Sequence, residues 1–204
     1  GGGTAITLCY GEFRESVDMD FLVSDLGCYR TLRQLLTGPE GINAIRTPEA
    51  MALQQQKEIR ADQYGLRTTL MVDNKPIKFE IILEGLIALE DPSKSDQLCG
   101  IATLTRLDMA TSKLLANADR WADASVFSRD VIDLAMMSPS SELLTTAISK
   151  AQIAYGNAIT HDLNKAINKL TTQNDWLDRC ILAMGIDTPK VLIWKNLQRL
   201  KQSV

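Results

Sequence analysis

The chain has 204 residues with a net charge of −3, and 5% of its residues are aromatic. This balance argues against a strongly basic nucleic-acid binder and against sheets that stack RNA bases on exposed rings. One histidine and four widely spaced cysteines argue against common zinc sites and against Ser-His-Asp or Cys-His catalysis. We expect a cytoplasmic protein with reduced cysteines in its core, no signal peptide and no membrane span.

In the first half of the chain, the pattern predicts strands mixed with helices. Residues 4–10 form a short apolar segment in which Thr4 is a suitable helix N-cap. Polar and apolar side chains then alternate over residues 16–23, which predicts a strand. Its expected faces are an apolar one with Val17, Met19 and Phe21 and an acidic one with Ser16, Asp18 and Asp20. The following elements are two helices (26–36 and 48–56), a β-hairpin (64–72 and 77–83), a loop (89–96) and a short strand (100–104).

The second half of the chain is expected to be helical, because the hydrophobic period changes near residue 105 and stays helical to the end. The expected helices span residues 107–122, 128–137, 140–155, 158–171, 174–184 and 189–202, with N-caps at Ser140, Asn174 and Thr188. We therefore predict an α+β protein with a mixed core over residues 1–105 and a helical lobe over residues 106–204.

Positive charge is concentrated towards the C-terminus. From Glu142 onward, eight Lys/Arg oppose five Asp/Glu, a balance of +3 against −6 for the rest of the chain. The last predicted helix carries four of these cations, Lys190, Lys195, Arg199 and Lys201. They form either a solvated helix face or a surface that contacts phosphate groups.

Asp18 and Asp20 lie two residues apart on the predicted strand 16–23, so their carboxylates should share one face within about 7 Å. Two such groups on a partly buried strand repel each other unless a cation neutralises them. Hard divalent cations such as Mg²⁺ or Mn²⁺ prefer oxygen ligands of this kind. The pair therefore predicts a metal site.

A third carboxylate is available in the predicted strand 77–83. Glu80 alternates there with apolar residues that are expected to face the core. If this strand pairs beside residues 16–23, Glu80 joins the aspartates, and three carboxylates could hold two metal ions. The alternative is an exposed face that Glu80 shares with Lys78. The other candidates for the third acid are Glu84 and Asp73.

Gly2, Gly3 and Thr4 form a glycine turn at the start of the sequence. Backbone N–H groups at such a turn, when it opens a helix, can bind phosphates. Arg14 and Ser16 precede the acid pair, where a cation and a hydroxyl could bind a triphosphate.

These pieces together resemble the opening motif of the AbiEii/AbiGii-type nucleotidyltransferase toxins of type IV toxin–antitoxin systems. In that family, a GGTAL-like turn is followed by R-x-S-x-D-h-D-h. Further along, Lys113 and the segment Arg129–Leu134 (R-D-V-I-D-L) resemble the family's helix lysine and its R-D-x-x-D-L segment. The resemblance covers about residues 1–135. It departs where the family has a third Asp rather than Glu80, and we expect the helix that precedes the family's GGT turn to be missing.

The resemblance implies a nucleotidyltransferase-like fold and transfer from a nucleoside triphosphate (NTP) to a hydroxyl, with an RNA such as tRNA as acceptor and a cognate antitoxin as partner. It implies nucleotide contacts from Gly2, Gly3, Thr4, Arg14, Ser16 and Lys113, metal binding by Asp18, Asp20 and Glu80, and catalytic roles for these acids, Lys113 and Asp130. Lys113 would contact the triphosphate or assist the attacking hydroxyl, and Asp130 would orient Lys113 or help place the substrate. Without the resemblance, Lys113 is only an exposed helix lysine and R-D-V-I-D-L only a helix that buries Ile132 and Leu134. Two alternatives stay open: an antibiotic-type enzyme with a small-molecule acceptor, and a non-catalytic module that binds nucleotide or a partner.

Overall fold

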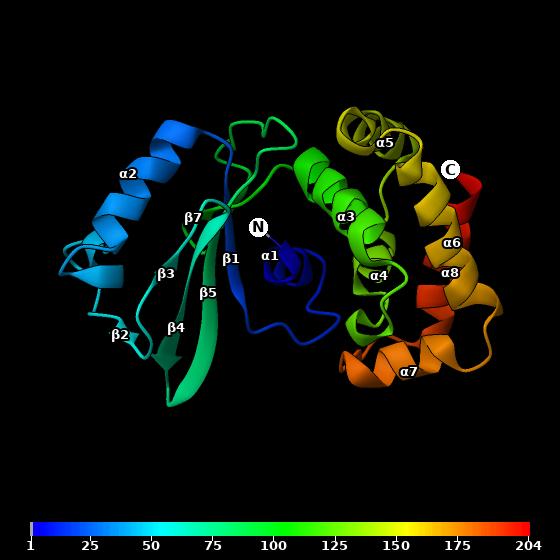
Figure 1. Ribbon diagram of the computed structural model, residues 1–204. Helices are drawn as coiled ribbons and strands as arrows, with labels where there is room; N and C mark the ends of the chain where they lie inside the picture. The colour runs from blue at the N-terminus through cyan, green and yellow to red at the C-terminus, as the bar shows by residue number, and fades with distance from the viewer. Residues whose placement is uncertain (1) are drawn as a thin grey trace. The chain divides into compact units, whose positions relative to one another are not determined.

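The computed structural model describes residues 2–204, so Gly1 of the glycine run lies outside the described residues. Within them the fold is α+β, as predicted, with eight α-helices and a five-stranded mixed sheet (Figure 1). The chain divides into two compact units, one over residues 17–88 and the other over residues 2–16 and 89–204. The predicted domains, 1–105 and 106–204, stay a prediction, because compactness alone does not show that a segment folds independently.

The first unit is built on the sheet. Its elements are β1 (Met19–Val23), α2 (Leu26–Leu36), η1 (Gly41–Ile45), β2 (Gln54–Gln55), β3 (Arg60–Ala61), β4 (Gly65–Val72) and β5 (Lys75–Leu83). The strand order is β1-β5-β4-β2, with β3 also paired to β4, and β1 runs parallel to β5 while the other pairs are antiparallel. The predicted hairpin is present. Asp73 and Asn74 form its turn with φ of 50° and 62°, a left-handed conformation that Asp and Asn tolerate.

One face of this sheet is packed by α2 and η1 (Figure 1). The Asp25 side chain caps α2 by accepting a hydrogen bond of 2.6 Å from the backbone of Cys28. The core beneath the helix consists of Tyr29, Leu36, Ile42, Leu66, Leu70, Phe79 and Ile81. Because side chains alternate along a strand, Phe79 and Ile81 of β5 enter this core, Leu83 packs against it, and Glu80 lies on the opposite face.

The strand predicted over residues 16–23 begins only at Met19. Its pairing to β5 starts with Met19 opposite Phe79, so Val17 and Asp18 precede the ladder. The expected apolar face is correspondingly short. Phe21 packs on the core, whereas Val17 is 68% exposed because no strand lies beside it.

The predicted helix over residues 48–56 is wrong. This segment is a turn followed by extended chain that ends in β2. Tertiary hydrogen bonds hold it extended. The Asn43 side chain bonds both the N–H and the C=O of Leu53, at 2.8 and 3.1 Å, and Gln55 Oε1 accepts from the N–H of Ile42 at 3.1 Å. These contacts outweigh a weak local helix propensity.

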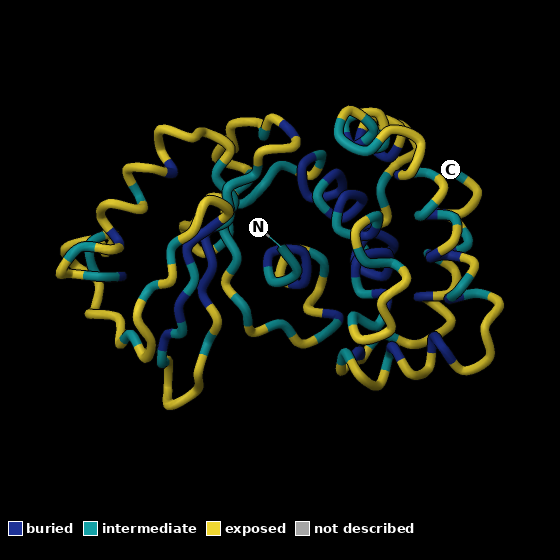
Figure 2. Tube along the Cα trace, in the orientation of Figure 1, coloured by how far each residue is buried: buried dark blue, intermediate teal, exposed yellow. Residues whose placement is uncertain are grey.

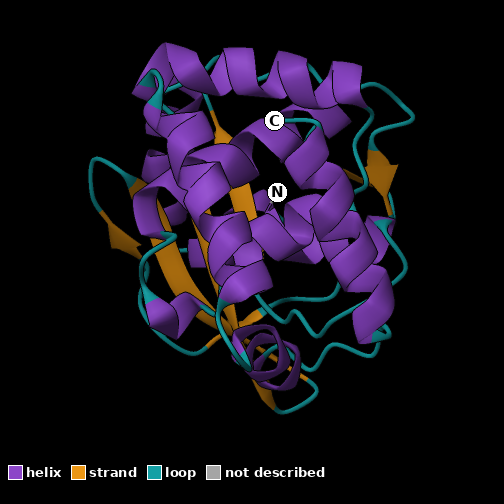
Figure 3. Ribbon diagram, turned by 90° about the vertical axis from the view of Figure 1, so that its right-hand side faces the viewer, coloured by secondary structure: helices purple, strands orange, loops and turns teal. Residues whose placement is uncertain are grey.

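The second unit is a helical bundle. Its elements are α1 (Gly2–Cys9), β6 (Gln97–Leu98), β7 (Ile101–Ala102), α3 (Arg106–Arg120), η2 (Ala124–Val126), α4 (Arg129–Met136), α5 (Ser141–Tyr155), α6 (Ala158–Thr172), α7 (Trp176–Ala183) and α8 (Lys190–Gln202). Figure 3 shows these helices packed against one another. Figure 2 shows α3 and α4 as the most buried of them, and Leu114, Ile132 and Leu134 are fully buried. Among the described helices, none combines the length and the hydrophobicity that a bilayer crossing requires.

The helix starts were predicted with mixed success. Ser140 caps α5 by accepting from the N–H of Leu143 at 3.2 Å, as expected. Asn174 and Thr188 do not cap, because α7 and α8 begin one residue later, after Asp175 and Pro189.

Two expectations about the core and the first helix were also wrong. Thr4 does not cap α1, which already begins at Gly2. All four cysteines are free, but only Cys180 is in the core, while Cys9, Cys28 and Cys99 are exposed.

Candidate active site

The acid pair lies on the first unit. Asp20 sits on β1 directly beside Glu80 on β5, and Asp18 lies one residue before the strand; both aspartates are half-buried. Burial raises the pKa of the Asp20 carboxyl, and the negative charges of Glu80 and Asp18 raise it further. A carboxylate with this environment is stabilised by a cation. The predicted pairing of residues 16–23 with residues 77–83 is present as the pairing of β1 with β5.

Glu80 is bound by two cationic side chains. Its carboxylate bonds Arg67 Nε at 3.0 Å and Lys78 Nζ at 2.7 Å, and its side chain is 11% exposed. Neither oxygen can bind a metal ion without weakening one of these ion pairs. Among residues 2–204, no three His, Cys, Asp or Glu side chains are gathered as a ready metal site. A cation held by all three acids would have to compete with Arg67 and Lys78 for the Glu80 carboxylate.

The alternative third acids have other roles. The Glu84 side chain accepts a hydrogen bond of 2.8 Å from the N–H of Leu86. Asp73 is exposed in the hairpin turn.

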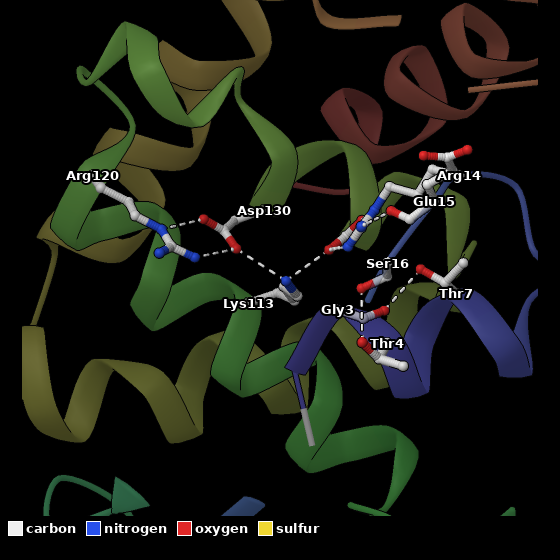
Figure 4. Close-up of polar contacts among 10 residues, drawn as sticks. Gly3, Thr4, Thr7, Arg14, Glu15, Ser16, Lys113, Arg120 and Asp130 are labelled. Carbon is white, nitrogen blue, oxygen red and sulfur yellow. Dashed lines mark hydrogen bonds and ion pairs between the residues drawn. The ribbon is translucent and has the colours of Figure 1, made fainter. Parts of the chain in front are cut away.

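The glycine turn belongs to the second unit, where it opens α1. Thr4 and Ser16 share a hydroxyl–hydroxyl hydrogen bond of 2.7 Å, and Thr7 Oγ1 donates to the C=O of Gly3 at 2.8 Å (Figure 4). Arg14 lies across Gly3, since a Cβ at that position would be 2.3 Å from Arg14 Nη2. A larger residue at position 3 would therefore force the guanidinium group to move.

Arg14, in the segment that follows α1, begins a chain of alternating charges that continues through α3 and α4. It forms two hydrogen bonds with Asp133, from Nε at 2.7 Å and from Nη2 at 2.9 Å. Lys113 Nζ lies 2.7 Å from Asp133 and 3.0 Å from Asp130. Arg120 completes the chain with bonds of 2.7 and 3.0 Å to Asp130 (Figure 4). We call these five residues (Arg14, Asp133, Lys113, Asp130 and Arg120) the buried charge network.

Neighbours within the network shift the pKa values of Lys113 and Asp130. Burial would lower the pKa of Lys113, but the carboxylates of Asp133 and Asp130 raise it above the ordinary value. Burial would raise the pKa of Asp130, but Lys113 and Arg120 lower it to about 2. Both shifts favour the charged forms of Lys113 and Asp130 at neutral pH. By residue type, the network has three basic side chains and two acidic ones, an excess of one positive charge that favours an anionic ligand.

The sequence predicts roles for Arg14, Lys113 and Asp130 but none for Arg120 or for Asp133, the second acid of the R-D-V-I-D-L segment. A signal for both was available. Asp133 follows Asp130 by three residues and Arg120 follows Lys113 by seven, which places each pair on one helix face. The apolar neighbours of Asp133, Ile132 and Leu134, indicate only a buried helix and give no sign of its ion pairs.

One comparison with known proteins identifies a family for this chain. A protein-family profile described as "Nucleotidyl transferase AbiEii toxin, Type IV TA system" matches residues 1–187. The chain belongs to this family. Membership in AbiEii makes nucleotidyl transfer in a toxin–antitoxin system its class of activity, with a nucleotide substrate and an antitoxin partner. No curated protein and no solved structure matches the chain.

Replacing Gly3 by alanine in this AbiEii protein should destabilise the second unit by about 1–2 kcal/mol. The new Cβ would push Arg14 away from Asp133, and losing a charge-assisted hydrogen bond outweighs the gain of at most about 1 kcal/mol in helix propensity. Urea unfolding followed by tryptophan fluorescence measures the change, since the three tryptophans all lie in the second unit. In an Arg14→Ala background, Gly3→Ala should no longer destabilise. Equal destabilisation in both backgrounds would show that Arg14 is not the reason for the glycine.

Acid should remove the contribution of Asp130 to stability. A carboxyl whose folded pKa is depressed stabilises the fold fully above its unfolded pKa, near 3.8, and loses this contribution as the pH falls towards about 2. Between pH 5 and pH 2, the wild type should therefore lose about 2 kcal/mol more than Asp130→Asn. Urea unfolding at a series of pH values checks this. Parallel stability curves for the two proteins would contradict the depressed pKa.

Proposed function

We propose that this protein is a metal-dependent nucleotidyltransferase that transfers a nucleotidyl group from an NTP to a hydroxyl of an RNA acceptor, such as tRNA, and releases pyrophosphate. The reactants are found inside the cell, in keeping with the expected cytoplasmic location. A cognate antitoxin would oppose the reaction, as the family description implies.

One observation carries this proposal: residues that are far apart in the sequence motif come together in the second unit. Arg14 and Asp133 are separated by 119 positions and share a bidentate ion pair. Lys113 and Asp130 join them within 3.0 Å. A merely structural lysine on an exposed helix would need no such set of partners. A net positive, pre-organised network suits the charge of a triphosphate.

The metal ion, Mg²⁺ or Mn²⁺, would be held by Asp18 and Asp20, with Glu80 as a third ligand if it leaves its lysine or arginine partner. When bound, such an ion supplies charge neutralisation of the triphosphate. The raised pKa of Asp20 supports this assignment, because burial and two acidic neighbours disfavour an uncompensated carboxylate.

The transfer itself needs few covalent roles from the protein. The acceptor oxygen forms a bond to the α-phosphorus, and the bond from that phosphorus to the bridging oxygen breaks. Pyrophosphate leaves with the electron pair, and the acceptor hydroxyl gives its proton to solvent water. Lys113 would bind phosphate oxygens, with Asp130 and Asp133 holding its ammonium group in place. Gly2, Gly3, Thr4 and Ser16 would supply backbone N–H and hydroxyl contacts. Catalysis on this scheme comes from positioning and charge.

For the RNA acceptor, we propose contacts along α8. Lys195 and Arg199 are exposed one turn apart, whereas Lys190 pairs with Asp178 at 2.6 Å and Lys201 bonds Asn168 at 2.8 Å. The double variant Lys195→Glu/Arg199→Glu should lower kcat/KM for RNA by about 10–100-fold and reduce the salt slope of RNA binding by about 2, with the KM for NTP unchanged. Lys57→Glu/Lys75→Glu on the first unit is the matched control. Equal effects of the two double variants would argue against α8 as the RNA surface.

A labelling screen tests the proposal as a whole. Purified protein with Mg²⁺ is incubated with each α-labelled NTP and with total RNA, tRNA, protein or aminoglycosides, and Asp18→Ala serves as the control. We expect label on RNA from the wild type alone. Label on a small molecule would indicate the antibiotic-type alternative. NTP binding without any labelling would indicate a non-catalytic module, and both outcomes would refute the proposal.

A further inference from the structure

The turn that precedes α4 has an unfavourable backbone conformation. Phe127 and Ser128 are consecutive left-handed residues, with φ of 51° and 49°. For residues other than glycine, this conformation costs about 1 kcal/mol or more each, and the surrounding structure must hold it. Ser128 occupies the N-cap position, yet its hydroxyl makes no capping bond to α4. A good capping residue is therefore used for something else.

The Ser128 hydroxyl is bound instead by Trp176, the first residue of α7. Trp176 Nε1 donates to Ser128 Oγ at 2.9 Å, and both residues are buried. The indole also stacks on the ring of Phe127, with centroids 6.3 Å apart and planes 16° apart. Asp175, just before it, is left-handed too, with φ of 58°. One side chain thus contacts both residues of the strained turn.

Trp176 is itself held firmly. Lys169 Nζ lies 4.4 Å and Arg179 Cζ 5.1 Å from the centre of its ring, so two cations contact one π-system. Cys180 lies nearby, and burial raises its pKa to about 11, so the thiol stays neutral. These contacts fit a fixed support better than a mobile side chain.

The turn sets the start of α4 and therefore the location of Asp130, which lies two residues after Ser128. Asp130 accepts hydrogen bonds from Lys113 and Arg120 at 2.7–3.0 Å. Bonds of this length tolerate little movement, and a displacement of about 1 Å can cost about 100-fold in rate at a pre-organised site. We propose that Trp176 is a positioning residue: it holds the Phe127–Ser128 turn and so fixes where Asp130 meets Lys113. Its effect on activity rests on the proposed function.

Two single variants and one double variant test this role. Trp176→Phe keeps an aromatic ring and removes the N–H donor, and Ser128→Ala keeps the ring and removes the acceptor. Both should lower kcat at least about 10-fold with little change in the KM for NTP. Ser128→Gly in the Trp176→Phe background should restore most of the activity, because glycine adopts the left-handed conformation without strain and leaves no unbonded hydroxyl.

Titration of Asp130 by carboxyl ¹³C NMR gives a readout that does not need activity, with Asp130→Asn for assignment. In Trp176→Phe and Ser128→Ala, the pKa of Asp130 should rise from about 2 towards its ordinary value, and Ser128→Gly should reverse the rise. Trp194→Phe, a partly exposed tryptophan on α8, is the matched control and should change neither readout.

The outcomes separate the two proposals. If the wild type proves inactive, the proposed function fails, and the Asp130 titration still tests the positioning role. If Trp176→Phe and Ser128→Ala lower stability but leave the Asp130 titration unchanged, Trp176 is only a packing residue and the inference is overturned. A failure of Ser128→Gly to restore the titration would overturn it as well.

Discussion

Asp133→Ala is expected to destabilise the second unit by about 3–5 kcal/mol and to abolish nucleotidyl transfer. The Asp133 side chain is fully buried between Arg14 and Lys113, at 2.7 Å from each. Removing one partner of a buried ion pair leaves the other charge uncompensated, which costs far more than the pair contributes. Here two cations would lose their partner at once. Tryptophan fluorescence during urea unfolding reports on this unit alone.

A second aspartate on the same unit provides the control. Asp178 forms an ion pair with Lys190 at 2.6 Å, but both side chains are about half exposed. Asp178→Ala should therefore change the free energy of unfolding by no more than about 1 kcal/mol. A double-mutant cycle of Arg14→Ala and Asp133→Ala should give a coupling of about 1–3 kcal/mol. Equal effects of Asp133→Ala and Asp178→Ala would contradict the buried charge network.

The sequence predicted on which face a candidate site residue lies better than it predicted which side chains bind that residue. The alternation of Glu80 with Phe79 and Ile81 predicted which face Glu80 would occupy, because a strand has a fixed period of two residues. The same period placed Lys78 on that face, where it binds the Glu80 carboxylate. It could not predict that Arg67 would bind as well, since Arg67 comes from the neighbouring strand. Arg14 and Asp133 are 119 positions apart, and no local pattern joins them.

The fold was predicted where local and tertiary preferences agree. The long amphipathic helices and the hairpin at Asp73-Asn74 have strong local signals. Residues 48–56 have a weak helical pattern, and side-chain hydrogen bonds from Asn43 and Gln55 overcome it. Ser128 looks like an ordinary N-cap in the sequence. Only the structure shows that its hydroxyl is bound by Trp176.

Asp20→Asn should have opposite effects on stability and on activity. The pKa of Asp20 is raised in the folded state, by burial first and then by Glu80 and Asp18. A carboxyl with a raised folded pKa destabilises the fold at all pH values above its unfolded pKa, near 3.8, and the cost disappears below it. At pH 7, the uncharged amide should therefore raise the melting temperature of the metal-free protein by about 1–3 °C.

The same substitution should remove the response to metal. Mg²⁺ that binds only the folded wild type raises its melting temperature with concentration, whereas Asp20→Asn should respond weakly and should lose at least about 100-fold in nucleotidyl transfer. Asp73→Asn makes the same chemical change in an exposed turn where Asn tolerates the left-handed backbone, so it should behave like the wild type in all three measurements. A lower melting temperature for metal-free Asp20→Asn would mean that Asp20 is a structural acid. A full response of Asp20→Asn to Mg²⁺ would place the metal elsewhere. The sign of the stability change therefore separates an acid held for a cation from one held for the fold.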